Sequence, residues 1–409
     1  MTNLSIKLVV LGAMAVACTT LAQNTPQQLM DRNLAAVRQS NFAYGLTLRE
    51  GYDSNIYTRQ NNVVGSFNTT MSPDFHFGWN NPTTSIGMHY TYSAVYWDRR
   101  TERQWDQSHD FNFNILHQFS PRLSVALNDS FTPGFEPDTE SGTSQRSADY
   151  IQNRAAAEAT YALNSRWDLT VSASHFFIRY DDNTSLAILP GTPVAFTMNR
   201  QTVDAHTFIK YKPQSTTTVA LGLGYQQTIY EGKDRSNAGE NFSLGVRHSF
   251  SPRLGADATV GGVVQTFNAV GGQTVNPDIS AGLNYMATSR TSLGFRFSTR
   301  MQPTEVDNYL EQQSMLFSGS VVHQFTSKLM GSASLMYVPA EYDSNLVFPG
   351  STVTGNHEET TLGGSWMLAY QFNIHLRGEL GYSFTHFTSD FANRSNDRHM
   401  TYLQARFGF

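Results

Sequence analysis

A short acidic string occurs three times in the chain. It reads GYDSN at 51–55, RYDDN at 179–183 and EYDSN at 341–345. Asp and Asn oxygens at alternate positions are ligands that calcium prefers, but a calcium loop also needs a central Gly and a late Glu, which all three copies lack. Asp and Asn also start turns, because their side chains bond nearby backbone groups. The strings therefore predict turns first, and a shared cation site only as an alternative.

Histidine is the other residue type that could do chemistry. Of the 12 histidines, His117, His248 and His323 each stand just before a short turn signal, and two of the three are followed by Gln-Phe. No His-x-x-Glu-His string, Cys pair or Gly-x-Ser-x-Gly elbow accompanies them. The sequence therefore predicts no catalytic residue, no metal site and no cofactor. Their recurrence at one position relative to the turns indicates an interface role, and the chain is not expected to be an enzyme.

The first residues have the pattern of a secretory signal peptide. Lys7 precedes an apolar run over 8–17, and Thr20-Leu21-Ala22 supplies the small residues that a signal peptidase reads. The run is about half as long as a transmembrane helix requires. Residues 1–22 are thus predicted to be the signal peptide, and its removal also removes Cys18, the only cysteine. The alternative is cleavage just before Cys18, which would give a lipidated N-terminus. Residues 23–40 become a periplasmic tail, too short for a transporter plug.

Composition and periodicity predict an all-β protein. Only 15% of the residues are charged, against about 25% in ordinary soluble domains, and there are 27 Phe and 19 Tyr. In IHLRGELGYSFTHF (374–387), one parity carries Leu376, Leu380, Tyr382 and Phe384, and the other carries His375, Arg377, Glu379, Ser383 and Thr385. The same alternation returns in NFSLGVRHSF (241–250) and TSLGFRFSTR (291–300). Such segments are strands with one apolar and one polar face.

Turn spacing favours a membrane barrel over a soluble sandwich. Short turn signals recur 37 to 48 residues apart, at 80–82, 120–122, 164–166, 212–214, 251–253, 288–290, 326–328 and around Asn373. Longer polar loops alternate with them, near 99–105, 136–148, 182–199, 231–238, 268–273, 303–309, 344–356 and 389–397. Short periplasmic turns and long extracellular loops are typical of outer-membrane barrels.

We therefore predict a transmembrane, antiparallel up-and-down β-barrel over residues 41–409. Its strands number about 18, with 16 as the alternative, because single-chain bacterial barrels have even numbers. The first two strands are expected at 42–57 and 64–79, and the last at 398–409. The strands that end at Tyr52, Tyr180 and Tyr342 then run toward the long loops. There each Tyr fits a girdle of aromatic side chains at the membrane surface.

The chain closes on an alternating segment, TYLQARFGF, in which Leu403, Ala405, Phe407 and Phe409 share one face. A terminal aromatic residue on such a strand resembles the signal by which the barrel assembly machinery recognises its clients. Phe407 and Phe409 are therefore the predicted barrel-assembly signal. The other expected partners are outer-membrane lipids, lipopolysaccharide, small solutes or ions and further copies of the chain, with no nucleic acid.

Several of these strings together resemble a known family. TLREGYDSNIYT near the start, HQFSPRL and HSFSPRL at hairpins, and ARFGF at the end resemble the second putative β-barrel porin family of Gram-negative bacteria. The resemblance covers most of the mature chain. It implies an outer-membrane barrel whose substrate is not established, and some members of the family accompany exosortase and exopolysaccharide gene clusters.

A barrel of this size has an interior wider than side chains alone fill, which predicts passive diffusion of small solutes. With the polar parity facing inward, the basic lumen residues are Arg49, Arg154, Lys210, Arg247, Arg296, Arg300, Arg377 and Arg406. The acidic ones are Glu158, Asp204 and Glu379, with Asp74, Asp168 and Asp257. The balance is slightly basic, and since rings of fixed charge set ion preference, a weak anion preference is expected.

The longest loop, over 181–199, is unusually apolar. It carries Leu186, Ile188, Leu189, Val194 and Phe196. We expect it to fold into the pore as a constriction or to pack against a neighbouring barrel, with a plain solvated loop as the other alternative. The functional alternatives to a porin are a dedicated exopolysaccharide export barrel and a structural or adhesive barrel without channel activity.

Overall fold

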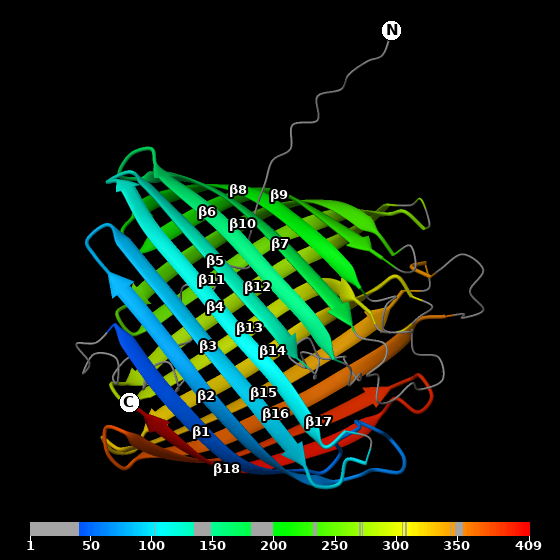
Figure 1. Cartoon of the computed structure of the whole chain (residues 1–409). Coiled ribbons are helices and arrows are strands. Elements are labelled where there is room, and N and C mark those ends of the chain that lie inside the picture. The colour runs from blue at the N-terminus through cyan, green and yellow to red at the C-terminus, as the bar shows by residue number, and fades with distance from the viewer. Residues whose placement is uncertain are drawn as a thin grey trace.

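The computed structural model describes residues 41–101, 103–134, 149–180, 199–231, 235–269, 271, 273–304, 306, 309–343, 345–347 and 355–409. The predicted signal peptide and tail lie outside these residues. The described residues form one antiparallel sheet of 18 strands (Figure 1). Each strand pairs with the next in sequence, and β1 pairs with β18 as well as with β2, which closes the barrel. None of the described segments is a helix long and apolar enough to cross a membrane.

The strands in chain order are β1 (Phe42–Asp53), β2 (Ser66–Asn80), β3 (Thr84–Trp97), β4 (Trp105–Ser120), β5 (Leu123–Gly134), β6 (Tyr150–Ala162), β7 (Trp167–Tyr180), β8 (Arg200–Gln214), β9 (Thr217–Tyr230), β10 (Asn237–Ser251), β11 (Leu254–Phe267), β12 (Gln273–Thr288), β13 (Thr291–Pro303), β14 (Glu311–Gln324), β15 (Leu329–Tyr342), β16 (His357–Gln371), β17 (Leu376–Ser389) and β18 (Asn396–Gly408). The predicted all-β class and the count of 18 strands are confirmed. The first strand ends at Asp53, four residues before the predicted end at 57.

The short turns have a common local cause. In seven of them the first residue is Asn, Ser or Thr, and its side-chain oxygen accepts a hydrogen bond from the backbone N–H two residues on. These residues are Asn81, Ser120, Asn164, Ser251, Thr288, Thr326 and Asn373. The turn predicted at 212–214 is wrong by a few residues, because β8 continues through a register shift to Gln214 before the chain reverses. Pro213 is tolerated there because it lies at a bulge.

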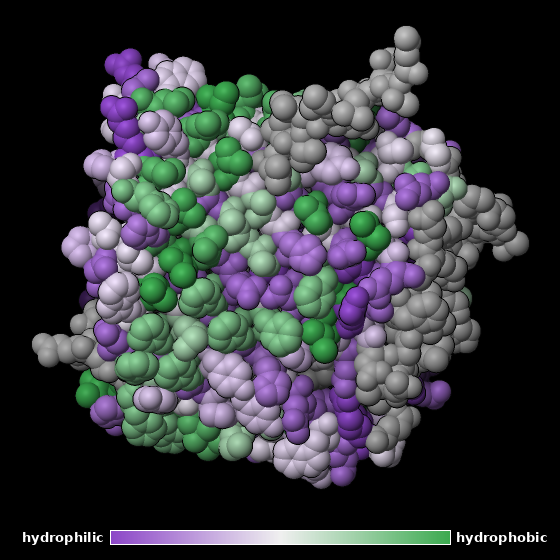
Figure 2. All heavy atoms as spheres, turned by 45° about the horizontal axis from the view of Figure 1, so that its top comes forward, coloured by the Kyte–Doolittle hydropathy of each residue, from purple (hydrophilic) through white to green (hydrophobic). Residues whose placement is uncertain are grey.

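The two faces of the sheet differ as the alternation predicts. Large hydrophobic side chains are exposed along the strands, and we call the face that carries them the outer face; Val275 is 72% exposed, Leu403 64% and Phe409 65%. Figure 2 shows hydrophobic side chains spread over the left and middle of one side of the barrel. An apolar surface of this extent requires a nonpolar environment. The opposite parity of each strand forms the inner face.

The repeated acidic string occupies two different positions. The aspartate starts a turn in the first and third copies, the two in which it lies among the described residues. The backbone N–H of Asn55 donates to Asp53 Oδ1 at 2.9 Å, and that of Asn345 donates to Asp343 Oδ1 at 2.8 Å. Tyr52 is exposed on the outer face, as a girdle residue would be. Tyr342 is fully buried on the inner face, and Tyr180 also has the inner parity of its strand, where it pairs with Tyr150. The girdle prediction is therefore wrong for these two copies, because their strands present the opposite parity at their ends.

The inner face as the candidate functional site

The inner face is polar and accessible. It consists mainly of Ser, Thr, Asn, Gln and Gly, one from each strand at each level. Asn112, Asn114, Asn128 and Arg154 all lie on it and are exposed, in the middle of β4, β5 and β6. A filled interior would bury such side chains, so the barrel has space for water next to these strands.

All of the charged residues predicted to line the lumen lie on the inner parity of their strands. The positions are Arg49, Asp74, Arg154, Glu158, Asp168, Asp204, Lys210, Arg247, Asp257, Arg296, Arg300, Arg377, Glu379 and Arg406. Their part in ion selection stays a prediction.

Several of these charges are already partnered near the short-turn edge. Arg377 forms an ion pair with Glu379, and both side chains are almost fully buried. Arg406 bonds Asp74 at 3.2 Å. These pairs neutralise each other and brace the wall between β17, β18 and β2, so they contribute little net charge to a passing solute.

The structure adds charged residues that the sequence analysis missed. On the inner parity of the strands these are Arg200, Lys212 and Arg398 on the basic side, and Asp53, Asp106, Asp110, Asp278 and Glu359 on the acidic side. The slight basic excess of the predicted set therefore disappears when all strands are counted. The alternation along each strand could have identified every one of these residues. It does not indicate which charges are paired.

Most of the added acidic groups near the long-loop edge are paired with arginines. Glu359 accepts from Arg394 Nε at 2.7 Å. Asp106 accepts from Trp97 Nε1 at 2.8 Å and from Arg103 Nη2 at 2.6 Å, and it also contacts Arg100. A hydrogen bond to Asp149, with further bonds to Asp106, raises the pKa of Arg103. These networks fix the mouth of the barrel rather than present free charge.

A different arrangement lies deeper in the barrel, on β6, β7 and β8. The guanidinium carbon of Arg154 lies 4.8 Å from the ring centroid of Phe176, and that of Arg200 lies 5.7 Å from the same ring. The Asp204 carboxylate stabilises the positive charge of Arg154, and the positive charges of Arg200 and Arg300 destabilise it. Arg300 does so from β13, which is seven strands away along the sheet. Among the described residues, the guanidinium groups of Arg154 and Arg300 form no hydrogen bond or ion pair.

At the long-loop mouth, the described residues of two segments between strands lie against the barrel wall. The described residues of these segments are 304, 306, 309 and 310 in the first and 343 and 345–347 in the second, and an isolated bridge joins Tyr309 to Val347. Their apolar side chains are buried against the barrel wall. We call this group the mouth cluster; it consists of Phe267, Val306, Tyr309, Leu310, Tyr342 and Leu346. Arg235 holds the first segment by donating to the carbonyl oxygens of Thr304 at 2.6 Å and Val306 at 3.3 Å.

The predicted constriction loop cannot be compared with this cluster. Leu186, Ile188, Leu189, Val194 and Phe196 lie outside the described residues. Sequence reasoning placed the constriction only there, although Val306 and Tyr309 in the predicted loop at 303–309, followed by Leu310, were a similar apolar signal.

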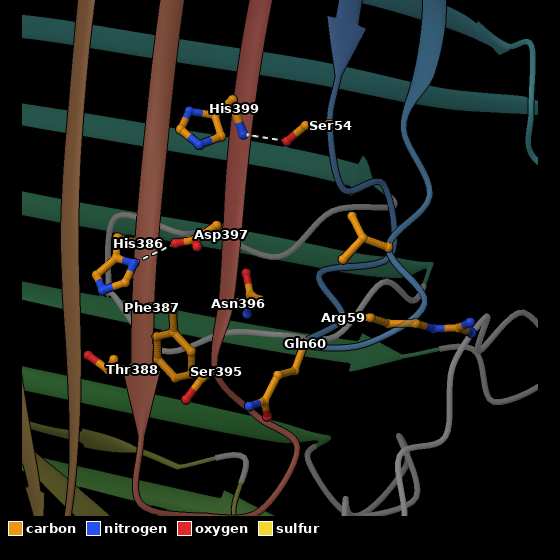
Figure 3. A pocket seen from close by; sticks show the side chains of 11 residues that line it. Ser54, Arg59, Gln60, His386, Phe387, Thr388, Ser395, Asn396, Asp397 and His399 are labelled. Carbon is orange, nitrogen blue, oxygen red and sulfur yellow. Dashed lines mark hydrogen bonds and ion pairs between the residues drawn. The ribbon is translucent and has the colours of Figure 1, made fainter.

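A pocket lies at the long-loop rim between β17, β18 and the segment after β1 (Figure 3). His386 Nδ1 contacts the Asp397 carboxylate, and the backbone N–H of His399 donates to Ser54 Oγ at 2.8 Å. Ser54 faces a backbone amide rather than an imidazole, so the pocket has no Ser-His pair of the catalytic kind. No cluster of three or more His, Cys, Asp or Glu side chains in the described ranges could hold a metal ion.

No curated protein sequence matches the chain. Solved structures that align with it include OccK2 (OpdF) of Pseudomonas aeruginosa in complex with glucuronate, at 11% identity and a TM-score of 0.47, covering 90% of this chain and 98% of that one. A BenF-like porin of Pseudomonas fluorescens Pf-5 aligns at 11% identity and a TM-score of 0.46, covering 90% and 99%. OccAB4 of Acinetobacter baumannii aligns at 8% and 0.46, covering 91% and 99%.

The family comparison is more direct. The family model described as Putative beta-barrel porin 2 matches residues 203–409, which run from β8 to the last residue. This match covers half of the chain and agrees with the family suggested by the sequence strings. The chain belongs to the Putative beta-barrel porin 2 family and is an outer-membrane β-barrel.

Proposed function

We infer that this protein is a channel, not an enzyme, through which small solutes and ions cross the outer membrane passively. The observation that carries this proposal is the exposure of polar side chains on the inner face, at Asn112, Asn114, Asn128 and Arg154. Closed barrels of this strand number enclose more space than their side chains fill. Water and small solutes can therefore occupy the interior next to these strands.

A weak preference for anions is the finer part of the proposal. It is supported by the guanidinium groups of Arg154 on β6 and Arg300 on β13, whose positive charges act on each other. Paired charges add little to the field, and most of the added acidic groups at the mouth are paired. Unpaired guanidinium groups attract carboxylates and phosphates through charge-assisted hydrogen bonds.

Two segments are proposed to limit the size of the solute. The mouth cluster covers part of the long-loop opening on the side of β11 to β18. The apolar segment 181–199 remains our second proposed constriction, on the grounds of its sequence. A pore with a fixed narrowing passes small solutes and excludes polymers, which favours a porin over a polysaccharide exporter.

The remaining proposals concern biogenesis. Phe409 is 65% exposed on the outer face, and its backbone N–H and C=O both bond Tyr44, so the last residue belongs to the barrel wall. This supports Phe407 and Phe409 as the assembly signal. From the sequence alone, we also propose that residues 1–22 are a signal peptide and that the barrel contacts lipopolysaccharide.

The test is electrical. The protein purified from outer membranes is inserted into a planar bilayer, and single-channel current and the reversal potential under a salt gradient are measured. We expect steady open steps and a reversal potential of the sign given by weak anion preference. A folded barrel that conducts only after residues 182–199 are removed would indicate a gated exporter instead.

A further inference from the structure

Three units of the same composition repeat along the short-turn edge. In each unit a His near the end of one strand bonds a Thr at the start of a neighbouring strand, and packs against a Phe two residues further on. We call them the His-Thr-Phe units; they are Thr84, His117 and Phe119 at β3 and β4, Thr217, His248 and Phe250 at β9 and β10, and Thr291, His323 and Phe325 at β13 and β14.

The three units share one geometry. The distance from Thr Oγ1 to His Nδ1 is 2.8 Å in each. The His and Phe ring centroids lie 4.4, 4.5 and 4.6 Å apart, with the rings edge to face. Because the Thr hydroxyl occupies Nδ1, the second ring nitrogen, Nε2, is left for another partner. Among the described residues none forms a hydrogen bond with Nε2 of His117, His248 or His323.

The units lie on the outer face at the level where the apolar surface ends. Phe119 is 64% exposed, Phe250 61% and Phe325 49%, while the three histidines are half-buried. Short turns lie on the periplasmic side of an outer-membrane barrel. Each Phe stands two residues nearer the turn than its His, so both rings lie in the zone between the headgroups and the hydrocarbon region, with the Phe between the His and the turn.

Each unit is also followed by a cation at a fixed place. Three residues after the Phe stands Arg122, Arg253 or Lys328, exposed in the turn. The turn is held because the backbone N–H of this residue donates to the first hydroxyl of the turn, at 3.2 Å to Ser120, 3.2 Å to Ser251 and 3.1 Å to Thr326. No described residue forms an ion pair with these three side chains.

We propose that each His-Thr-Phe unit, with the cation of its turn, binds the phosphate group of a lipid in the periplasmic leaflet. When the Thr hydroxyl donates to Nδ1, Nε2 carries the ring proton and donates to a phosphate oxygen. The Arg or Lys adds a charge-assisted contact with the same group. The Phe, between the His and the turn cation, packs against the apolar part of the same lipid. Anionic headgroups are favoured over zwitterionic ones, because each turn carries a positive charge.

The chain also contains a His-Phe pair without the rest of the unit, near the long-loop end of β7, which serves as a control for the pair alone. His175 and Phe177 have the same spacing on the outer face of β7, but their ring centroids lie 6.2 Å apart. No Thr bonds His175 in the described structure, and Tyr180 stands where the cation would be. A His and a Phe two residues apart are therefore present without the rest of the unit.

The test measures lipid retention by native mass spectrometry. The barrel purified from outer membranes, in detergent micelles, is titrated with phosphatidylglycerol, phosphatidylcholine or inorganic phosphate. The compared variants are His117→Leu/His248→Leu/His323→Leu, Arg122→Gln/Arg253→Gln/Lys328→Gln and the control His175→Leu. We expect the wild type to retain more phosphatidylglycerol than phosphatidylcholine, and each triple variant to lose affinity about fivefold or more. The control should match the wild type.

The turn variant changes only exposed side chains, so it decides the question if the histidine variant fails to fold. Unchanged phosphatidylglycerol binding in the turn variant would overturn the proposal. Equal retention of both lipids by the wild type would also overturn it. Displacement of phosphatidylglycerol by inorganic phosphate at equal concentration would assign the units to free phosphate rather than to lipid, and would overturn the lipid assignment.

Discussion

The carboxylate of Asp53 and the guanidinium of Arg398 form an ion pair between the first and the last strand. Oδ2 of Asp53 accepts from Arg398 Nε at 2.9 Å and from Nη2 at 2.5 Å, and the side chains are 1% and 10% exposed. Oδ1 of the same carboxylate accepts from the backbone N–H of Asn55. One aspartate therefore joins the two ends of the barrel and starts the first turn.

Asp53→Asn should lower the free energy of unfolding by about 3 kcal/mol, because removing one member of a buried ion pair leaves the other charge without compensation. Urea unfolding of the barrel in lipid vesicles measures this change. The control is Asp98→Asn, since Asp98 is an exposed carboxylate in the next long connection. Equal unfolding midpoints for Asp53→Asn and the wild type would show that the pair does not stabilise the seam.

Arg154→Gln/Arg300→Gln should shift the reversal potential under a salt gradient toward cation preference. The two guanidinium groups act on each other across the lumen and are unpaired among the described residues. Their removal leaves Arg200 as the neighbouring cation beside the Asp204 and Asp278 carboxylates, so the local charge becomes more negative. The control is Arg122→Gln in a periplasmic turn. A reversal potential that stays constant in the double variant contradicts the assigned selectivity.

Leu310→Ala/Leu346→Ala should increase single-channel conductance. Both side chains are buried in the mouth cluster, and truncating a buried leucine costs about 2 to 5 kcal/mol, more than a short segment on a wall can offset. The segments 304–310 and 343–347 then leave the inner face and the mouth widens. Leu335→Ala, at an exposed position of the outer face, is the control. Conductance equal to that of the wild type would mean that the cluster does not narrow the pore.

Asp343→Asn should change the free energy of unfolding by less than about 0.5 kcal/mol, as surface substitutions usually do. An Asn side chain can accept the same bond from the backbone N–H of Asn345. The calcium alternative makes a different prediction, namely a loss of calcium-dependent stabilisation. Melting the wild type and the variant with calcium and with a chelator separates the two, and a chelator effect that vanishes in the variant would favour the cation site.

The sequence carried the architecture because a barrel is specified locally. Alternation gives each strand its two faces, and an Asn, Ser or Thr at the start of a turn reverses the chain through a bond only two residues long. Long-range partners are not specified in this way. Asp53 and Arg398 are 345 residues apart, and neither strand shows by itself that the other completes it.

The interior was less predictable than the wall. Parity placed Arg154 and Arg377 on the same face, but it does not tell that Arg377 is neutralised by Glu379 while Arg154 stays unpaired. Loops that fold inward break the alternation altogether. Val306 in the predicted loop at 303–309 and Leu310 just after it were visible as apolar residues, yet their contacts with Tyr342 and Phe267 depend on the closed barrel.

The central claim is that the barrel conducts, and the single-channel current of the wild-type protein in a planar bilayer tests it most directly. The exposed polar side chains of the inner face predict steady open steps, with the reversal potential displaced toward anions. A folded barrel that stays closed at all voltages, including after removal of residues 182–199 and in Leu310→Ala/Leu346→Ala, would contradict the channel.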